Sequence, residues 1–201
     1  MAGILTNLSR TVIAGIVLTI IMVIVIAGWY GEGADFDHAY WAFFFRWLHV
    51  LSGVMWIGLL WYFNFVQIPN MGNIPDDQKP AIGKVIAPAA LFWFRWGAAA
   101  TIVTGLILAW LNGYLVDAIA LGLIDDVAKD TAIGIGMWLG AIMWFNVWFV
   151  IWPNQKRALG MVEADADTKA RSGRIAMLFS RTNTLLSIPL LYAMVSAQNL
   201  Y

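Results

Sequence analysis

The chain has 201 residues, of which 61% are hydrophobic and only 12% are charged, and its mean hydropathy is +0.74. A soluble domain has about 45–50% apolar and about 25% charged residues, so this composition excludes a water-soluble fold and indicates a membrane protein. Twelve basic residues balance twelve acidic ones, which argues against a basic nucleic-acid-binding surface. The absence of cysteine excludes disulfides, thiolate metal sites and covalently attached c-type haem.

Five stretches are long and apolar enough to cross a bilayer core, which needs roughly 20 residues per helix. In chain order they are Thr11–Trp29, Trp41–Val66, Ala87–Leu111, Thr131–Trp152 and Ala176–Ala197. Glycine or proline follows the first four, at Gly31-Glu32-Gly33, Pro69, Gly113 and Pro153, and we expect these residues to stop each helix. The sequence therefore predicts an all-α integral membrane protein with a five-helix transmembrane bundle.

The first span differs from the other four because it carries no polar stripe. We interpret residues 1–39 as an N-terminal transmembrane anchor helix followed by an external acidic linker, and residues 40–201 as a four-helix membrane domain. A uniformly apolar helix adds nothing to a polar interior, so we expect this one at the periphery, against lipid and another membrane subunit. The predicted partners are the bilayer and other membrane subunits, and no nucleic acid.

Orientation follows from the basic residues, which concentrate in cytoplasmic loops. With five spans, the N-terminal tail and the loops after the second and fourth spans lie on one side, and they contain Arg10, Lys79, Lys84 and the basic residues of 156–174. The acidic segments around Asp35 and 117–130 lie on the other side. We therefore predict a multi-pass protein of the bacterial inner membrane with a cytoplasmic N-terminus and an external C-terminus.

Polar residues inside the spans are the candidates for function, because they are costly in a bilayer. In the second span one helical stripe contains Gly53 together with the strongly polar residues of the span, Arg46, His49, Asn64 and Gln67, and such a stripe faces other helices. Further polar side chains occur in the later spans. We predict a buried polar network made of Asn64, Arg95, Asn146, Arg181 and Thr184. The alternatives are hydrogen bonds that only fix packing and, for the arginines, snorkelling toward a membrane surface.

His49 is the best candidate for a cofactor or metal ligand. It follows Phe43-Phe44-Phe45, with Arg46 one turn before it and Gly53 one turn after it, and this environment suits a porphyrin and its propionates. His38, the other histidine of the chain, precedes the span. The sequence therefore predicts a cofactor site at His49, Arg46 and Gly53 that holds haem b or another metal through His49, or else no cofactor, with His49 as a packing residue or proton relay.

Several motifs match a known family. The run Arg46–Gly58 (RWLHVLSGVMWIG) resembles the opening helix of the membrane domain of PuuD-type urate hydroxylases, the urate oxidase N-terminal domain family. The resemblance continues through 62–67, 93–97, 146–155 and 180–184. It implies a membrane bundle associated with electron transfer, in which His49, Arg46, Arg95 and Arg181 match motif positions. Two departures put urate activity in doubt: the chain lacks a cytochrome c domain, and residues 1–39 are added.

The function predicted from this reasoning is an integral membrane subunit of a redox complex, respiratory or oxygenase, with haem b bound through His49. Two alternatives remain open. The chain is a structural accessory subunit without cofactor that docks through its N-terminal helix, or it is a free-standing membrane oxidoreductase related to urate hydroxylase. The sequence favours a chain that is not catalytic by itself, and it does not indicate a substrate.

Overall fold

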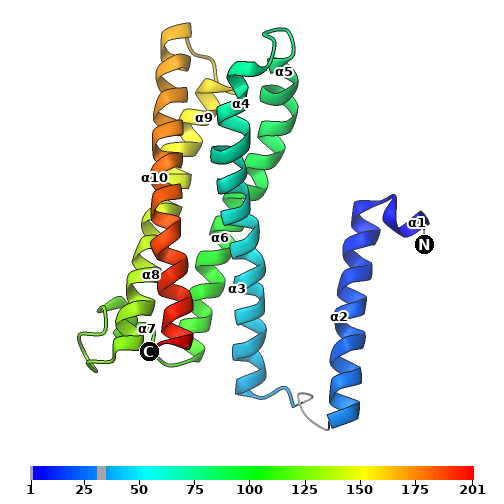
Figure 1. Cartoon of the computed structure of the whole chain (residues 1–201), viewed down its shortest axis with the longest axis vertical. Helices are drawn as coiled ribbons and strands as arrows, with labels where there is room; N and C mark the ends of the chain where they lie inside the picture. The colour runs from blue at the N-terminus through cyan, green and yellow to red at the C-terminus, as the bar shows by residue number, and fades with distance from the viewer. Residues whose placement is uncertain (1, 31–34) are drawn as a thin grey trace. The chain divides into compact units, whose positions relative to one another are not determined.

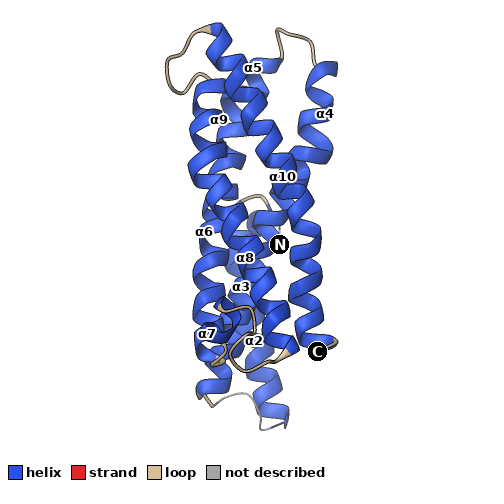
Figure 2. Cartoon of the chain, turned by 90° about the vertical axis from the view of Figure 1, so that its left-hand side faces the viewer, coloured by secondary structure: helices blue, strands red, loops and turns tan. Residues whose placement is uncertain are grey.

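The computed structural model describes residues 2–30 and 35–201, so the predicted turn at Gly31-Glu32-Gly33 lies outside the described residues. The described part is helical and contains no strand (Figure 2). It forms two compact units, Met1–Phe44 and Phe45–Tyr201, which are described separately. The α-helices are, in chain order, α1 (Ala2–Leu5), α2 (Leu8–Tyr30), α3 (His38–Trp61), α4 (Ile68–Asn70), α5 (Lys79–Ala81), α6 (Ala87–Leu111), α7 (Leu115–Ile119), α8 (Ala128–Phe145), α9 (Trp152–Ala158) and α10 (Ala166–Asn199).

The first unit contains α2, a helix of 23 residues that is long and apolar enough to cross a membrane. Its two threonines do not present free hydroxyls. Thr11 Oγ1 donates to the carbonyl oxygen of Asn7 and Thr19 Oγ1 to that of Gly15, each at 3.0 Å. Since both hydroxyls donate to backbone carbonyls one turn earlier, neither is free to bond to another helix, which fits an anchoring role in lipid.

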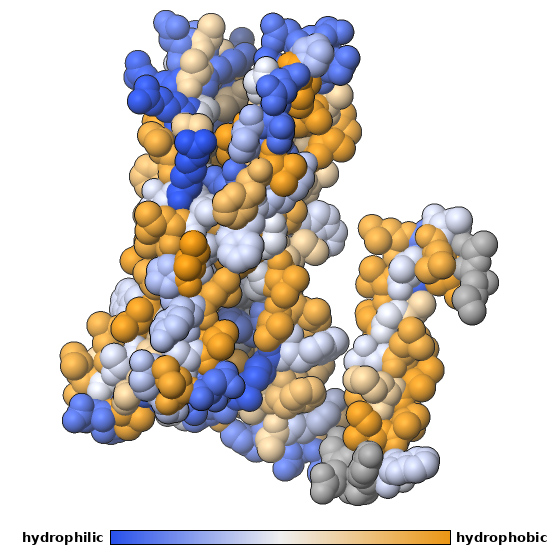
Figure 3. Space-filling view, viewed as in Figure 1, coloured by the Kyte–Doolittle hydropathy of each residue, from blue (hydrophilic) through white to orange (hydrophobic). Residues whose placement is uncertain are grey.

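The second unit is a bundle of long helices that run side by side (Figure 1). Its centre is a cluster of large apolar side chains contributed by α3, α6, α8 with the turn after it, and α10; the fully buried members include Trp56, Leu60, Leu91, Phe94, Met143 and Ile151. On the face shown in Figure 3, hydrophilic residues gather at the two ends of the bundle and hydrophobic residues cover its middle. This is the distribution expected for a helical bundle that crosses a bilayer.

Four of the helical stretches qualify as membrane spans by length and composition: Leu8–Trp29, His38–Asn73, Lys79–Leu111 and Ala128–Ala158. The fifth predicted span corresponds to α10, which has 34 residues and is therefore about 51 Å long. It is less apolar because its buried face carries serines and an asparagine, yet it packs along α8 and α9 for the length of the bundle (Figure 1). The chain is thus a multi-pass helical membrane protein, as predicted.

Prolines do not end the second and fourth spans, contrary to the sequence-based expectation. Helix α3 continues through the π-helical turn η1 (Tyr62–Gln67) into α4, and α8 continues through η4 (Asn146–Ile151) into α9. A third π turn, η3 (Ile82–Ile86), precedes α6. Each π turn ends two residues before a proline. Since proline has no N–H and clashes with the carbonyl a turn earlier, a widened turn lets the helix continue.

We call this part of the bundle, with Pro69, Pro88 and Pro153, the proline end. Asparagine side chains bond to the helix backbone next to two of these prolines. Asn70 Nδ2 donates to the carbonyl oxygen of Val66 at 2.7 Å, and Asn154 Nδ2 donates to that of Val150 at 2.8 Å. The exit of α6, in contrast, is where the sequence predicts it, since the helix ends at Leu111 and Gly113 adopts a φ of +79° that favours glycine.

Candidate functional site

His49 lies between α3 and α6. Its Nδ1 is 2.9 Å from the carbonyl oxygen of Thr101, and the hydroxyl of Thr104 is 3.4 Å from the same nitrogen. The imidazole rests directly on Gly105, where an added Cβ would come within 2.8 Å of His49 Cε1. Glycine at this position is therefore what lets the ring lie against α6.

The partner of Nδ1 determines the form of the imidazole. A carbonyl oxygen only accepts hydrogen bonds, so Nδ1 carries the proton and donates it to Thr101, and in the neutral ring the lone pair is on Nε2. Nε2 has no hydrogen-bond partner among the described residues. Ser52, three residues after His49, does not orient the ring, because it donates its hydroxyl to the carbonyl oxygen of Leu48 at 2.8 Å.

The other two predicted cofactor residues lie on either side of His49 along α3. Arg46 is exposed, and its charge acts on the phenol of Tyr114, in the loop after α6. Burial raises the pKa of the Tyr114 phenol, and the positive charge of Arg46 offsets part of this rise. Gly53 is half-buried, and an added Cβ there would meet nothing within 4 Å. Space next to α3 is therefore open one turn from His49.

The buried polar network forms around one face of α10. Asn64 Nδ2 donates to Ser180 Oγ at 2.7 Å, and Asn146 Nδ2 donates to Asn183 Oδ1 at 2.9 Å. Asn183 is fully buried, and its own amide donates to the carbonyl oxygen of Met143 at 2.9 Å. These bonds tie both α3 and α8 to α10.

Ser187 extends this network by one turn, since it accepts a 2.9 Å hydrogen bond from Trp61 Nε1. Sequence reasoning missed Ser180, Asn183 and Ser187, although their i, i+3, i+7 spacing marks one helical face. Arg181 and Thr184, which the sequence predicted for the network, each follow a buried residue by one position, so the predicted face is rotated by one residue from the observed face. Thr184 is half-buried and bonds only to the carbonyl oxygen of Ser180, at 3.1 Å.

Arg181 does not join the network, which corrects the sequence-based expectation. Its side chain is exposed, whereas its neighbour Ser180 is buried. The reason is helical geometry, because successive residues are 100° apart and the buried face of α10 is fixed by Ser180, Asn183 and Ser187. Snorkelling, the alternative reading, fits an arginine in this position.

Arg95 is half-buried and makes contact with aromatic rings. Its guanidinium carbon lies 3.2 Å from the centre of the Trp152 ring and 5.9 Å from that of Trp148. Two of its nitrogens, Nε and one Nη, are buried without a hydrogen-bond partner among the described residues. Arg95 therefore joins α6 to the α8–α9 helix through a cation–π contact, apart from the asparagine network.

A metal site of several protein ligands does not occur in the described part, where no group of three or more His, Cys, Asp or Glu residues is placed to hold an ion. What the site offers instead is a single imidazole, fixed in one tautomer and set between two helices. Such an imidazole can serve as one axial ligand, as a hydrogen-bond acceptor through Nε2, or as a proton carrier.

Comparison with known proteins gives one match. The sequence model of the family described as Urate oxidase N-terminal matches residues 127–200, the segment that contains α8, η4, α9 and α10. This confirms the predicted resemblance for that part of the chain, whereas residues 40–126 lie outside the matched segment. No curated protein and no solved structure matches the chain.

Proposed function

We propose that this urate hydroxylase-related membrane domain is a subunit of a membrane redox complex and that His49 holds haem b. The observation that carries the proposal is the hydrogen bond from His49 Nδ1 to the carbonyl oxygen of Thr101, at 2.9 Å. Histidines that bind metal usually donate their second ring nitrogen to a carbonyl or carboxylate, which fixes the ring and raises the basicity of the ligating nitrogen. Nε2 would be the ligating atom here.

The donor set fits a haem better than a free metal ion. Haem iron takes four ligands from the porphyrin, so one histidine is sufficient on the protein side. A lone imidazole does not hold a zinc or copper ion in a closed protein site, which needs three or four ligands. The open space at Gly53 and the positive charge of Arg46 lie one turn from His49 on either side, where a flat ring and its carboxylates would be accommodated.

In this proposal the chain's own residues would hold and orient the haem, and the bound haem would supply one-electron transfer. Thr101 fixes the imidazole tautomer, Gly105 leaves room for the ring, and Arg46 would compensate negative charge near the membrane surface. The asparagine network around Asn183 holds α3 and α8 at fixed positions against α10. The substrate of the complex is outside this proposal, since no catalytic group of this chain is assigned.

A reduced-minus-oxidised spectrum of the purified chain tests the proposal directly. We expect a b-type haem spectrum that His49→Ala abolishes while circular dichroism and gel filtration show a folded bundle. His38→Ala is the matched control, because His38 is exposed at the start of α3, and it should leave the spectrum unchanged. A wild-type protein without haem, prepared from haem-supplemented cells, would refute haem binding and leave His49 as an interhelical hydrogen-bonding residue.

The remaining parts of the proposal concern placement and partners. We propose a bacterial inner-membrane location with Met1 in the cytoplasm and Tyr201 outside, because the basic residues gather in the loops that five spans place in the cytoplasm. Reporter fusions at Tyr201 test this orientation, and a cytoplasmic Tyr201 would contradict it.

We also propose that α2 docks against another subunit. Deleting residues 1–30, with a replacement signal sequence, should abolish co-purification of the partner and leave the second unit folded.

A further inference from the structure

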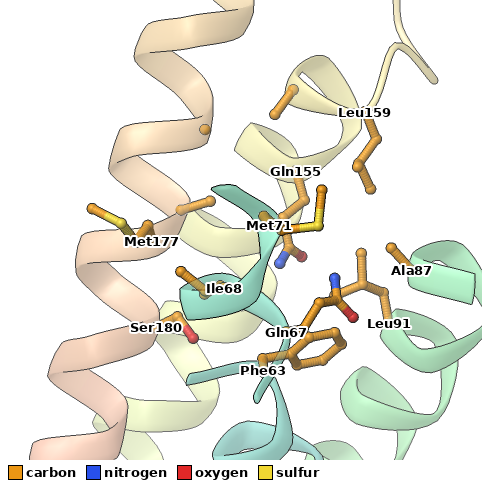
Figure 4. Close-up of a pocket in the computed structure, with 13 residues that line it drawn as sticks. Phe63, Gln67, Ile68, Met71, Ala87, Leu91, Gln155, Leu159, Met177 and Ser180 are labelled. Atoms are coloured by element: carbon orange, nitrogen blue, oxygen red, sulfur yellow. The ribbon is translucent and has the colours of Figure 1, made fainter. Parts of the chain in front are cut away.

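A cavity of about 270 Å³ lies at the proline end of the bundle, remote from His49. Its lining comes from four separate parts of the chain, namely η1 with α4, α6, α9 and α10 (Figure 4). Gln67 is 18 residues after His49 on the same continuous helix, which places the two sites about 27 Å apart along its axis. The cavity is therefore a second site and not an extension of the first.

Three polar side chains reach this cavity from different helices: Gln67 from η1, Gln155 from α9 and Ser180 from α10 (Figure 4). The side-chain carbonyl oxygens of both glutamines are buried without a hydrogen-bond partner among the described residues. Ser180 Oγ accepts the amide of Asn64 at 2.7 Å, so its own proton remains available to donate. Unpaired buried carbonyls weaken a fold unless a ligand or water pairs with them.

The remaining walls are apolar and adaptable. Phe63 and Leu91 flank the polar groups. The thioether of Met71 lines the cavity from the turn after α4, and that of Met177 lines it from α10. No charged side chain lines the cavity. A ligand that fits must therefore be neutral, because a bound ion would find no counter-charge in a low-dielectric site.

We propose that this cavity binds the ring of a quinone and its quinol. The ring is flat, neutral and apolar, with a hydrogen-bonding oxygen at opposite edges, and this matches a cavity with apolar walls and two glutamines from different helices. The unpaired oxygens of the two glutamines can accept from quinol hydroxyls, and a half-turn of the amide presents its NH₂ as a donor to a quinone carbonyl. The same two side chains thus serve both oxidation states of the ligand.

Size and location favour the same ligand. Pockets for small molecules usually measure about 300–1,000 Å³, so this cavity suits a single substituted ring and not a large cofactor. It lies among the membrane-spanning helices and is partly open, so an isoprenoid tail can remain in the lipid. An organic anion of similar size fits less well, since the cavity offers it no positive charge.

Photolabelling of the full-length chain in phosphatidylcholine nanodiscs tests the proposal, with an azido-quinone as the probe and decylubiquinone as the competitor. We expect labels on peptides that contain Met71, Leu91 or Met177, removed by excess decylubiquinone. The double variant Gln67→Leu, Gln155→Leu should bind about tenfold more weakly, because it loses two hydrogen bonds. Gln198→Leu is the matched control, since Gln198 is exposed near the opposite end of the bundle.

Thermal unfolding shows whether weaker quinone binding by the glutamine variants results from the lost hydrogen bonds or from a destabilised fold. The ligand-free double variant should be at least as stable as wild type, because leucine removes two unpaired buried carbonyls. Equal labelling in the double variant, labels spread over the lipid-facing surface, or competition by urate but not by decylubiquinone would each overturn the proposal. Haem binding at His49 is measured separately by its spectrum, so either proposal can fail alone.

Discussion

The two helical hairpins of the bundle are held together in different ways. Between α8 and α10 the contact relies on small residues: Gly136 faces the end of the Met194 side chain, Gly140 faces Leu190, and Asn183 pairs with Asn146. Between α3 and α6 glycine also permits close approach, at Gly97 against the backbone of Trp56 and at Gly105 against the ring of His49. The polar contact between these helices is the imidazole of His49 on a backbone carbonyl instead of an amide pair, and aromatic rings meet edge to face, such as Phe63 and Phe94, whose ring centres are 5.7 Å apart.

This difference indicates that α8–α10 mainly supports the fold and that α3–α6 carries the candidate functional site. Close packing over glycine and buried amide pairs gives helices one well-defined arrangement in lipid, where no hydrophobic force drives their association. The segment that contains the buried Asn146–Asn183 pair is also the one that the urate oxidase N-terminal family model matches. The α3–α6 side instead carries the oriented imidazole of His49, and together with α9 and α10 it encloses the cavity at the proline end. We interpret the α8–α10 hairpin as the scaffold on which the other hairpin presents its side chains.

The largest effect that separates the hairpins is expected at Asn183. Asn183→Ala leaves the amide of Asn146 and the carbonyl oxygen of Met143 unpaired in a buried site, so the free energy of unfolding should fall by about 2 kcal/mol. Denaturation in mixed detergent micelles measures this. Asn199→Ala is the control, because Asn199 is exposed and bonds only within its own helix turn. Equal stability of the two variants would contradict the scaffold role of α8–α10.

Gly105→Ala should give the next largest effect and act on the other hairpin. The new Cβ would come within 2.8 Å of the His49 ring, so the imidazole must shift and its bond to Thr101 must lengthen. We expect a loss of about 1–2 kcal/mol in stability and a changed haem spectrum if haem is bound. Gly53→Ala is the matched control for stability alone, because its Cβ meets nothing within 4 Å, and its unfolding free energy should be unchanged or slightly higher.

The two membrane arginines should respond differently, which sharpens the distinction between contact and exposure. Arg95→Leu removes the stacking on Trp152 and should cost about 1 kcal/mol in unfolding free energy. Arg181→Leu should change it by less than about 0.5 kcal/mol, because Arg181 is exposed and substitutions at exposed positions usually have small effects. Detergent unfolding of both variants, with Arg95→Lys as a conservative third, measures the difference. A larger loss of unfolding free energy for Arg181→Leu than for Arg95→Leu would indicate that Arg181 is part of the buried network.

The smallest expected effect lies at the start of α10 and depends on pH. Asp165 accepts hydrogen bonds from the backbone N–H and the hydroxyl of Thr168, at 2.7 and 2.9 Å, and these bonds lower the pKa of its carboxyl. A lowered pKa means that the ionised carboxylate stabilises the fold above its unfolded pKa and that this contribution is lost as the pH falls through the folded pKa. Asp165→Asn should therefore differ most from wild type near neutral pH and converge with it in acid. Parallel stability curves across this range would refute the charged cap.

The sequence by itself determined that the chain is helical, that it lives in a membrane and where most helices run, because apolar length and the scarcity of charge leave no other solution. It also singled out His49, Asn64 and Asn146, because polar groups are rare and costly inside spans. It misjudged Pro69 and Pro153 as helix ends, since whether a proline breaks a helix or is absorbed in a π turn depends on the neighbours of that turn.

Only the tertiary structure decided which polar residues meet. The partner of His49 is a backbone carbonyl on α6, and a carbonyl leaves no signature in a sequence. Which face of α10 is buried followed from its packing against α3 and α8, and this put Asn183 inside and Arg181 outside although only two positions separate them. The cavity at the proline end likewise depends on four segments that are distant along the chain, so its two glutamines become neighbours only when the bundle has formed.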